Sequence, residues 1–344
     1  MLAACLAGGA AYAGAPSISG FVDASYNYNL LAPVKSTVNT YHGYDAKSKS
    51  FMLNAAHLAL SGSDNASGLG YNVETDMGTD AAANDPNSPS GLFDVQEAYL
   101  TYGFGADKAW GLKAGKYATY EGIEVVESGS NPTISRGFLY VMAEPVTHTG
   151  AEISYSEKMW DLHVGLVNGW DLVADNNNMP TLLAKLGLNM GDPLALTVST
   201  LIGSEVVAGN TKSMRMSFDA TGVNKSIKGV DLWLQGNYGM EAKASVVKPG
   251  GDASWLGFGV QPFWHMNDNC GIGARYEYFS DPDGSRTGKT TKRTLMNISV
   301  APAYWWTKNL MSRVEYRLDL SDQADFAGGK KNQSVLSGDL IASF

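Results

Sequence analysis

Charged side chains recur at every second position in two segments of the sequence, and the members of this set are Arg275, Glu277, Arg313, Glu315, Arg317 and Asp319. Residues two apart lie on the same face of a β-strand, so the charges of each segment share one face. Such a face requires water, because burying an unpaired charge in apolar surroundings is costly. The intervening residues, such as Val314 and Tyr316, are apolar. The pattern predicts strands that separate water from lipid, with charges that act on dissolved solutes by electrostatics.

A second polar group lies in the longest predicted connection, about residues 118–147, and comprises Glu121, Glu124, Glu127, Asn131 and Arg136. We expect this segment to fold inward as a constriction loop whose acidic edge faces the wall arginines. Opposite charges separated by water would create a transverse field that orients dipolar solutes and filters ions. A second interpretation stays open, since each arginine has an acid two residues away on the same face and local ion pairs would neutralise it.

The histidines are scattered through the sequence: His42, His57, His148, His163 and His265. No two of them have the spacing of a metal-ligand pair, and none stands in a recognisable arrangement with a nucleophile. Glycine-rich stretches such as 103–105 are not followed by a helix that would hold a phosphate. The sequence therefore predicts no enzyme, no metal site and no cofactor.

Composition indicates a turn-rich β protein. The 344 residues include 39 Gly, 17 Tyr and 8 Trp, with 17% charged and 44% apolar residues. No apolar run reaches the length of about 18 residues that a membrane helix needs. The formal net charge of −9 excludes a nucleic-acid partner as the main function, because such partners require a basic surface.

The first thirteen residues are small, apolar and uncharged, and they end in Ala11-Tyr12-Ala13. This is the A-x-A pattern of a signal peptide, although a positive first region is missing and the start lies, on this interpretation, inside a longer signal. A lipoprotein box at Leu2–Cys5 is the alternative. We expect residues 1–13 to be removed and residues 14–344 to form a single domain.

Alternation of apolar and polar residues continues along the whole chain. Between Ile18 and Leu30 it lasts longer than an average strand and fits a tilted membrane-spanning strand of about nine to eleven residues with an overhang. We count sixteen candidate strands, which begin near residues 17, 50, 68, 93, 109, 148, 159, 180, 194, 212, 228, 254, 270, 293, 309 and 333. The faces of the strands near 50 and 93 are ambiguous, so fourteen or eighteen strands also remain open. The expected fold is an all-β, transmembrane, antiparallel up-and-down barrel.

The predicted connections alternate between long and short. Long ones cover about 31–49, 78–92, 118–147, 171–179, 204–211, 241–253, 281–292 and 321–332. Long extracellular loops opposite short periplasmic turns are typical of outer-membrane barrels. Aromatic residues gather in two bands, with Trp110, Trp160, Trp264, Tyr304, Trp305 and Trp306 beside short turns and Tyr26, Tyr28, Tyr238, Tyr276 and Tyr278 beside long loops. Two such bands indicate the two membrane interfaces.

About sixteen strands enclose more space than their side chains fill, and this leaves an aqueous channel. The sequence thus predicts passive diffusion of small hydrophilic solutes or ions through a barrel surrounded by outer-membrane lipid. The alternative is a receptor or adhesin whose lumen is plugged and whose loops, such as Thr79–Ser90, bind a partner. Barrels of this size are commonly homotrimers, and the sequence leaves the oligomeric state open.

Two sequence blocks and the carboxyl terminus carry a family resemblance. The chain ends on Phe344, which resembles the terminal aromatic that the barrel insertion machinery reads. Residues 18–26 (ISGFVDASY) and residues 113–150, with Gly115-Lys116-Tyr117 and a final Pro145–Gly150 block, resemble the OmpL-like β-barrel porin family. The resemblance implies an outer-membrane channel and assigns no substrate and no residue roles.

Overall fold

The computed structural model describes residues 16–33, 35–36, 38–84, 91–190, 193–207 and 210–344. The predicted signal peptide at 1–13 lies outside these residues, and the expected division into 1–13 and 14–344 stays a prediction. In the described residues the chain folds into sixteen strands, and each begins within two residues of its predicted start. Period-two alternation located them correctly because each strand turns one face toward lipid where it crosses the membrane.

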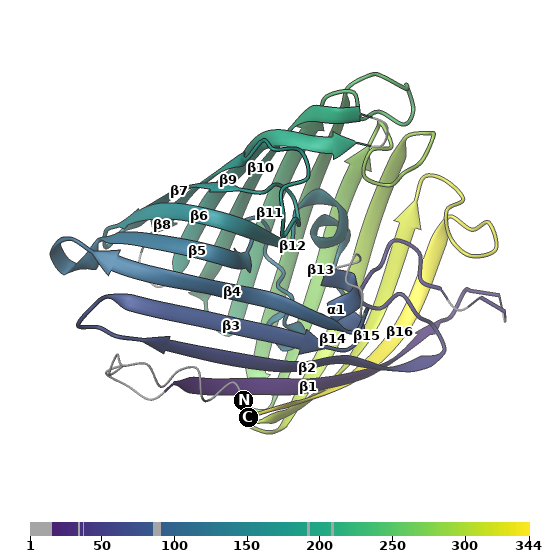
Figure 1. Ribbon diagram of the computed structural model, residues 1–344. Helices are drawn as coiled ribbons and strands as arrows, with labels where there is room; N and C mark the ends of the chain where they lie inside the picture. Colours follow the sequence, from purple (N-terminus) through teal and green to yellow (C-terminus); the bar gives the residue numbers. More distant parts are fainter. Residues whose placement is uncertain (1–15, 34, 37, 85–90, 191–192, 208–209) are drawn as a thin grey trace.

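The strands are β1 (Ser17–Asn29), β2 (Ser50–Ser63), β3 (Leu69–Met77), β4 (Phe93–Phe104), β5 (Trp110–Ala118), β6 (Thr147–Ser156), β7 (Trp160–Val167), β8 (Thr181–Asn189), β9 (Leu194–Val207), β10 (Asn210–Ile227), β11 (Val230–Glu241), β12 (Ala253–Asn267), β13 (Cys270–Asp281), β14 (Arg293–Thr307), β15 (Leu310–Ser321) and β16 (Asn332–Ser343). Every strand pairs with its sequence neighbours, and β1 pairs antiparallel with β16 from Phe21 opposite Ser343 to Asn29 opposite Val335. The sheet is thus a closed barrel (Figure 1). Closure removes the free edges that would otherwise leave backbone groups unpaired in lipid.

The two faces of the barrel have opposite character. On β15, Val314 and Tyr316 are exposed on the outside, while Arg313 and Arg317 are buried on the inside. An apolar outer surface with polar groups enclosed is the reverse of a soluble protein and matches a wall that stands in lipid. This confirms the predicted transmembrane barrel and the face assignments on this strand.

Short helical segments occupy some of the connections. They are α1 (Thr79–Asn84), η2 (Ala106–Lys108), η3 (Ser128–Ser130) and η4 (Leu139–Ala143), the last a single π-helical turn. Among the described residues, no helix has both the length and the apolar character that a membrane crossing needs.

Two details differ from the prediction. Strand β9 extends to Val207 and β10 begins at Asn210, so most of the connection expected at 204–211 belongs to strands. Trp305 packs inside the barrel against Phe263, with ring centroids 6.0 Å apart, and borders an internal cavity. It therefore does not belong to the outer aromatic band that the sequence indicated.

Candidate functional site

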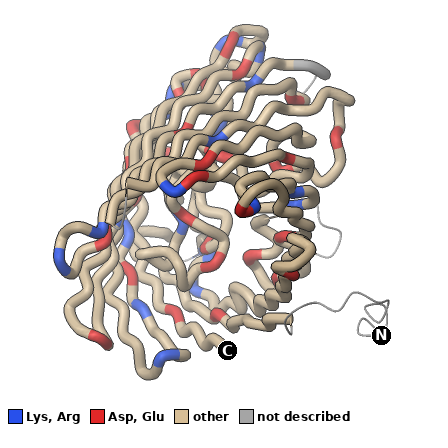
Figure 2. Tube along the Cα trace, turned by 90° about the vertical axis from the view of Figure 1, so that its left-hand side faces the viewer, with Lys and Arg blue, Asp and Glu red and all other residues tan. Residues whose placement is uncertain are grey.

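The connection between β5 and β6, residues 119–146, runs through the interior of the barrel; we call it the lumen loop. Figure 2 shows chain segments inside the ring of strands, and η3 and η4 both belong to the lumen loop. Seven side chains, from η4, from the residue before it and from the facing wall, form one buried apolar cluster: Phe138, Leu139, Met142, Ala143, Trp255, Phe279 and Leu295. The run from Phe138 to Ala143 is apolar, and the wall of β12, β13 and β14 removes it from water.

Arg275 on β13 attaches the middle of the lumen loop to the wall. Its guanidinium donates to Glu124 Oε1 at 2.7 Å, Thr133 Oγ1 at 2.9 Å, and both the carbonyl oxygen (2.5 Å) and Oγ (2.8 Å) of Ser135. The planar fork of arginine suits several acceptors at fixed positions. Arg275 thus joins the wall to loop residues that lie 140 to 151 positions earlier in the sequence.

Arg313 on β15 holds the tip of the lumen loop in the same manner. It donates to the carbonyl oxygens of Ser128 (3.0 Å), Asn131 (2.9 Å) and Thr133 (3.2 Å), and to Ser128 Oγ at 2.7 Å. Its charge is balanced by Asp339 on β16, whose Oδ2 lies 2.6 Å from Nη2. The arginine therefore binds the loop through three backbone oxygens and one hydroxyl, while its ion pair is with a residue of the wall.

The two wall glutamates accept hydrogen bonds from the lumen loop. Glu277 Oε2 accepts from the amide of Phe138 at 2.6 Å, while the Glu315 carboxylate accepts from the amide and the Oγ of Ser135, each at 2.7 Å. A Cβ at Gly137 would overlap the Glu277 carboxylate as it now lies, so any larger residue would displace that carboxylate from the loop. These contacts satisfy backbone amides that would otherwise be buried without a partner.

The third arginine contacts a different connection. Arg317 Nη1 donates to Asp45 at 2.7 Å and its Nε to Asp319 at 3.1 Å, and His42 Nε2 lies 3.0 Å from Asp319. Asp45 and His42 belong to the connection between β1 and β2, so a second inward-folding segment covers this part of the wall. The sequence interpretation missed it, because the residues of this connection follow no period.

The prediction that acids of the loop face the wall arginines across open water is wrong. All six wall residues, Arg275, Glu277, Arg313, Glu315, Arg317 and Asp319, are buried, and Arg275 and Glu124 form a direct ion pair at 2.7 Å. The reason is that the lumen loop lies on this wall and excludes water from it. The alternative of local pairs holds for Arg317 with Asp319 at 3.1 Å and, more loosely, for Arg275 with Glu277 at 3.9 Å. It does not hold for Arg313, which pairs with Asp339.

The polar residues of the lumen loop have different surroundings. Asn131 exchanges two hydrogen bonds with the backbone of Val125, at 2.9 and 2.7 Å, and braces the loop internally. Arg136 donates to the carbonyl oxygens of Val125 and Val126 and lies 3.6 Å from Asp80 of α1. Both are buried, so neither faces solute. Glu127 is partly exposed, accepts from Gln96 Nε2 at 2.5 Å and borders a cavity.

The two ends of the lumen loop, which we call its stem, approach the wall of β10 and β11 through carboxyl groups. Glu121 Oε1 accepts from Ser217 Oγ at 2.6 Å, and Glu144 Oε2 accepts from Gln235 Nε2 at 2.5 Å. Burial raises the pKa of both loop carboxyls well above the usual range, and the nearby Asp219 carboxylate adds to both shifts. Burial thus stabilises the protonated form of the stem acids relative to that of an exposed carboxyl group.

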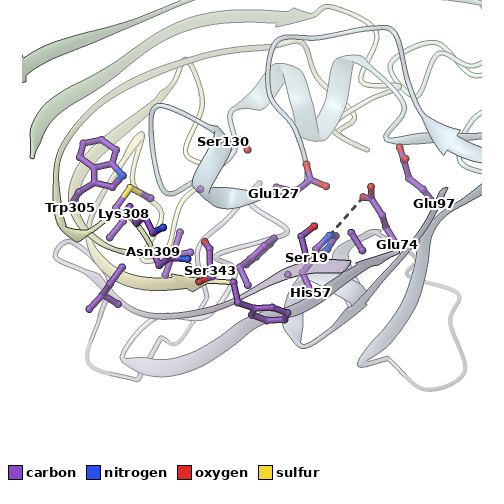
Figure 3. A pocket seen from close by; sticks show the side chains of 18 residues that line it. Ser19, His57, Glu74, Glu97, Glu127, Ser130, Trp305, Lys308, Asn309 and Ser343 are labelled. Carbon is purple, nitrogen blue, oxygen red and sulfur yellow. Dashed lines mark hydrogen bonds and ion pairs between the residues drawn. The ribbon is translucent and has the colours of Figure 1, made fainter. Parts of the chain in front are cut away.

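A cavity of about 620 Å³ opens at the end of the barrel that carries the short turns (Figure 3). We call it the vestibule. Glu74 of β3, Glu97 of β4 and Glu127 of the lumen loop line one side, and Lys308 and Trp305 line the other. Figure 3 shows Glu74, Glu127 and His57 of β2 converging, with Glu97 beyond Glu74. This group comes from four separate segments, and for that reason spacing in the sequence did not reveal it.

Basic groups along the neighbouring wall are paired. Lys113 Nζ lies 3.4 Å from Glu152 and over the rings of three tyrosines, and Lys185 Nζ lies 2.5 Å from Asp161. His163 Nδ1 lies 3.0 Å from Glu152. Their charge is largely compensated, whereas the vestibule acids have amide partners: Asn72 bonds Glu74 and Glu97, and Gln96 bonds Glu127.

Comparison with solved structures shows the same fold in outer-membrane proteins. The outer-membrane channel DcaP of Acinetobacter baumannii superposes with a TM-score of 0.70 at 16% identity, over 98% of this chain and 100% of that one. OmpT of Vibrio cholerae in its trimer form gives 0.62 at 13% identity, over 96% and 99%. OprB of Pseudomonas putida gives 0.60 at 11% identity, over 96% and 94%. At these identities the likeness establishes the fold alone.

Family membership comes from the sequence itself. No curated protein matches the chain closely enough to count as a relative. Residues 16–344 match the family described as "Putative beta-barrel porin-2, OmpL-like", which confirms the resemblance first noted in residues 18–26 and 113–150. The closed barrel, its apolar outer surface and its inward-folded loop agree with that assignment. The chain belongs to the OmpL-like β-barrel porin family and is a channel protein of the outer membrane.

Proposed function

We propose that the lumen loop forms the narrow part of a passive diffusion channel for small hydrophilic solutes, and that the channel prefers cations. The arrangement of the loop supports this proposal. Arg275 and Arg313 hold it on the wall of β13 and β15, and the cavity beside its tip is lined by residues of β1 to β4, of β14 to β16 and of the loop itself. Solutes that pass the vestibule meet Glu74, Glu97 and Glu127 there.

The cation preference depends on one observation, the uneven pairing of charges. Within the described part of the chain, no lysine or arginine lies within ion-pair distance of Glu74, Glu97 or Glu127, while Lys113 and Lys185 each have a carboxylate partner. Lys308, on the far side of the vestibule, supplies one opposing charge. Fixed charge of one sign in a narrow, low-dielectric passage concentrates counter-ions. The net negative charge therefore favours cations.

The test is the reversal potential of single channels in a planar bilayer under a KCl gradient. We expect steady ohmic steps and a reversal potential on the cation side, reduced toward zero in Glu74→Gln/Glu97→Gln. Glu157→Gln, an acid at a turn outside the vestibule, serves as the matched control. An anion-side reversal potential in the wild type would refute the preference. A folded barrel that stays silent would refute the channel and favour a receptor with a plugged lumen.

The remaining parts of the proposal concern assembly. We propose a homotrimer, supported by the trimer form of the structurally similar OmpT, and recognition of β16 by the insertion machinery through Phe344. Phe344 is exposed, and its backbone exchanges hydrogen bonds with Gly20 at 3.0 and 3.2 Å. We assign the protein no catalytic step. Native mass spectrometry in detergent tests the trimer, and loss of outer-membrane insertion on deletion of Phe344 tests the signal.

A further inference from the structure

We infer that His57, Glu74 and Glu127 bind a divalent transition-metal cation such as Zn²⁺ at the edge of the vestibule. One ligand atom of each residue can be chosen so that all three lie within 4.8 Å of one another. The residues come from β2, β3 and the lumen loop, and Figure 3 shows their polar ends converging. Donor atoms around a cation with bonds of about 2.1 Å lie about 3 to 4 Å apart, so small side-chain adjustments complete the site.

The orientation of the imidazole is the observation that points to a metal. Nδ1 of His57 lies 2.9 Å from Asp76 Oδ1, and Nε2 is directed at Glu74, 3.8 Å away. The ring also stacks on Phe21, with centroids 4.8 Å apart and planes 13° from parallel. A carboxylate that receives the N–H of one ring nitrogen fixes the tautomer and presents the other nitrogen as a ligand. Asp76 occupies that supporting position.

The carboxylates near His57 carry negative charge that a bound cation would neutralise. Glu74, Glu97 and Glu127 line the same side of the vestibule, and the hydrogen bonds they receive from side chains come from the amides of Asn72 and Gln96. Among the described residues no lysine or arginine pairs with them. The rival arrangement is an imidazolium that bridges Asp76 and Glu74. It would neutralise one charge and leave Glu127 uncompensated.

The donor set selects the class of cation. One imidazole nitrogen with carboxylate oxygens suits zinc, cobalt and nickel, whereas calcium and magnesium prefer oxygen ligands throughout. The vestibule adjoins the site, so water can fill the remaining coordination positions. Such an open, three-ligand site binds a cation reversibly and does not enclose it.

Metal binding would connect the tip of the lumen loop to the wall formed by β2 and β3, which β16 and β1 separate from β15. Glu127 precedes η3, whose Ser128 is held by Arg313, while His57 and Glu74 belong to β2 and β3. A cation between them would lie at the edge of the vestibule, between the loop tip and this wall. Zn²⁺ should therefore reduce conductance, a consequence that rests on the proposed channel although the binding itself does not.

Isothermal titration of ZnCl₂ into the detergent-solubilised full chain at pH 7.5 tests the binding. We expect one Zn²⁺ per chain, with affinity about 10–100-fold weaker in Asp76→Asn, which removes only the supporting carboxylate. His57→Gln and Glu127→Gln should abolish saturable binding. His265→Gln is the matched control, because His265 is an exposed histidine 3.2 Å from a carboxylate, Asp231, away from the vestibule.

Three results overturn the site: no saturable binding, binding that His265→Gln removes, or binding that Glu127→Gln leaves intact. Glu127 lies in the lumen loop and outside the sheet, and its contact with the wall is a side-chain hydrogen bond from Gln96 of β4, so this variant keeps the test valid even where His57→Gln does not fold. Bilayer recordings separate the two proposals. Steady conductance without Zn²⁺ binding refutes the metal site alone, whereas Zn²⁺ binding to a silent barrel refutes the channel alone.

Discussion

Replacing Arg313 with glutamine should release the tip of the lumen loop while leaving the barrel intact. The side chain makes four hydrogen bonds to the loop, to the oxygens of Ser128, Asn131 and Thr133 and to Ser128 Oγ. At about 1 kcal/mol net for each bond, the loss is about 4 kcal/mol. One decade in an equilibrium constant corresponds to about 1.4 kcal/mol, so the ratio of docked to undocked tip should fall by about 10³.

Glutamine at this position also leaves Asp339 as a buried carboxylate without its ion pair, and this lowers the stability of the barrel wall. The informative comparison is therefore Arg313→Gln/Asp339→Asn against Asp339→Asn alone. Single-channel recording should show added open-channel noise or a second conductance level only in the double variant. Equal, quiet currents in both variants would refute the argument. If the double variant no longer migrates as a folded barrel on an SDS gel before heating, Arg313 stabilises the wall itself.

Three further predictions concern the same loop. Gly273→Ala places a Cβ against the carbonyl oxygen of Pro132 and should raise open-channel noise without changing any charge. Trp255→Leu removes a side chain that donates to the carbonyl oxygen of Ala143 and covers η4, and should cost about 3 kcal/mol of loop docking, measured as faster amide exchange in η4. Docking of the stem should weaken as pH rises above the usual carboxyl pKa, because the raised pKa of Glu144 means that the docked state binds more protons; amide exchange between pH 5 and 9 measures this.

Each of these predictions has a control or an outcome that contradicts it. Gly236→Ala, on β11, meets no atom within 4 Å of its new Cβ and should behave as the wild type. Glu144→Gln should reduce the pH dependence of the stem, and a variant with an unchanged pH profile would show that other groups titrate. Amide exchange in η4 that Trp255→Leu does not accelerate would mean that the tryptophan contributes nothing to docking.

The barrel could be predicted from sequence because one physical requirement repeats in each strand. A lipid-facing residue must be apolar and its neighbour faces the interior, so Val314 and Tyr316 report the outside of β15 wherever the strand lies in the barrel. The ambiguous strands near 50 and 93 form β2 and β4, and they complete the count of sixteen. Trp305 was misplaced because an aromatic residue near a turn suits either face.

The candidate site could be predicted only in part. Alternation correctly placed Arg275 and Arg313 on the inside, but it carries no information about what covers them. Their partners lie in a loop without periodicity, 140 or more residues away. The group around His57 was missed for the same reason, since Glu74 and Glu127 reach it from separate segments only after the sheet has closed.

The long sequence separation between the lumen loop and its anchors has a consequence for biogenesis. The apolar residues of η4 are covered by β12, β13 and β14, and the loop tip by β15, all of which are later in the chain. A partly assembled barrel thus carries an uncovered apolar segment and a wide mouth. Such intermediates are prone to aggregation. The narrowing of the passage is completed only after the last strands arrive, so an unfinished barrel would be the leakiest form of the protein.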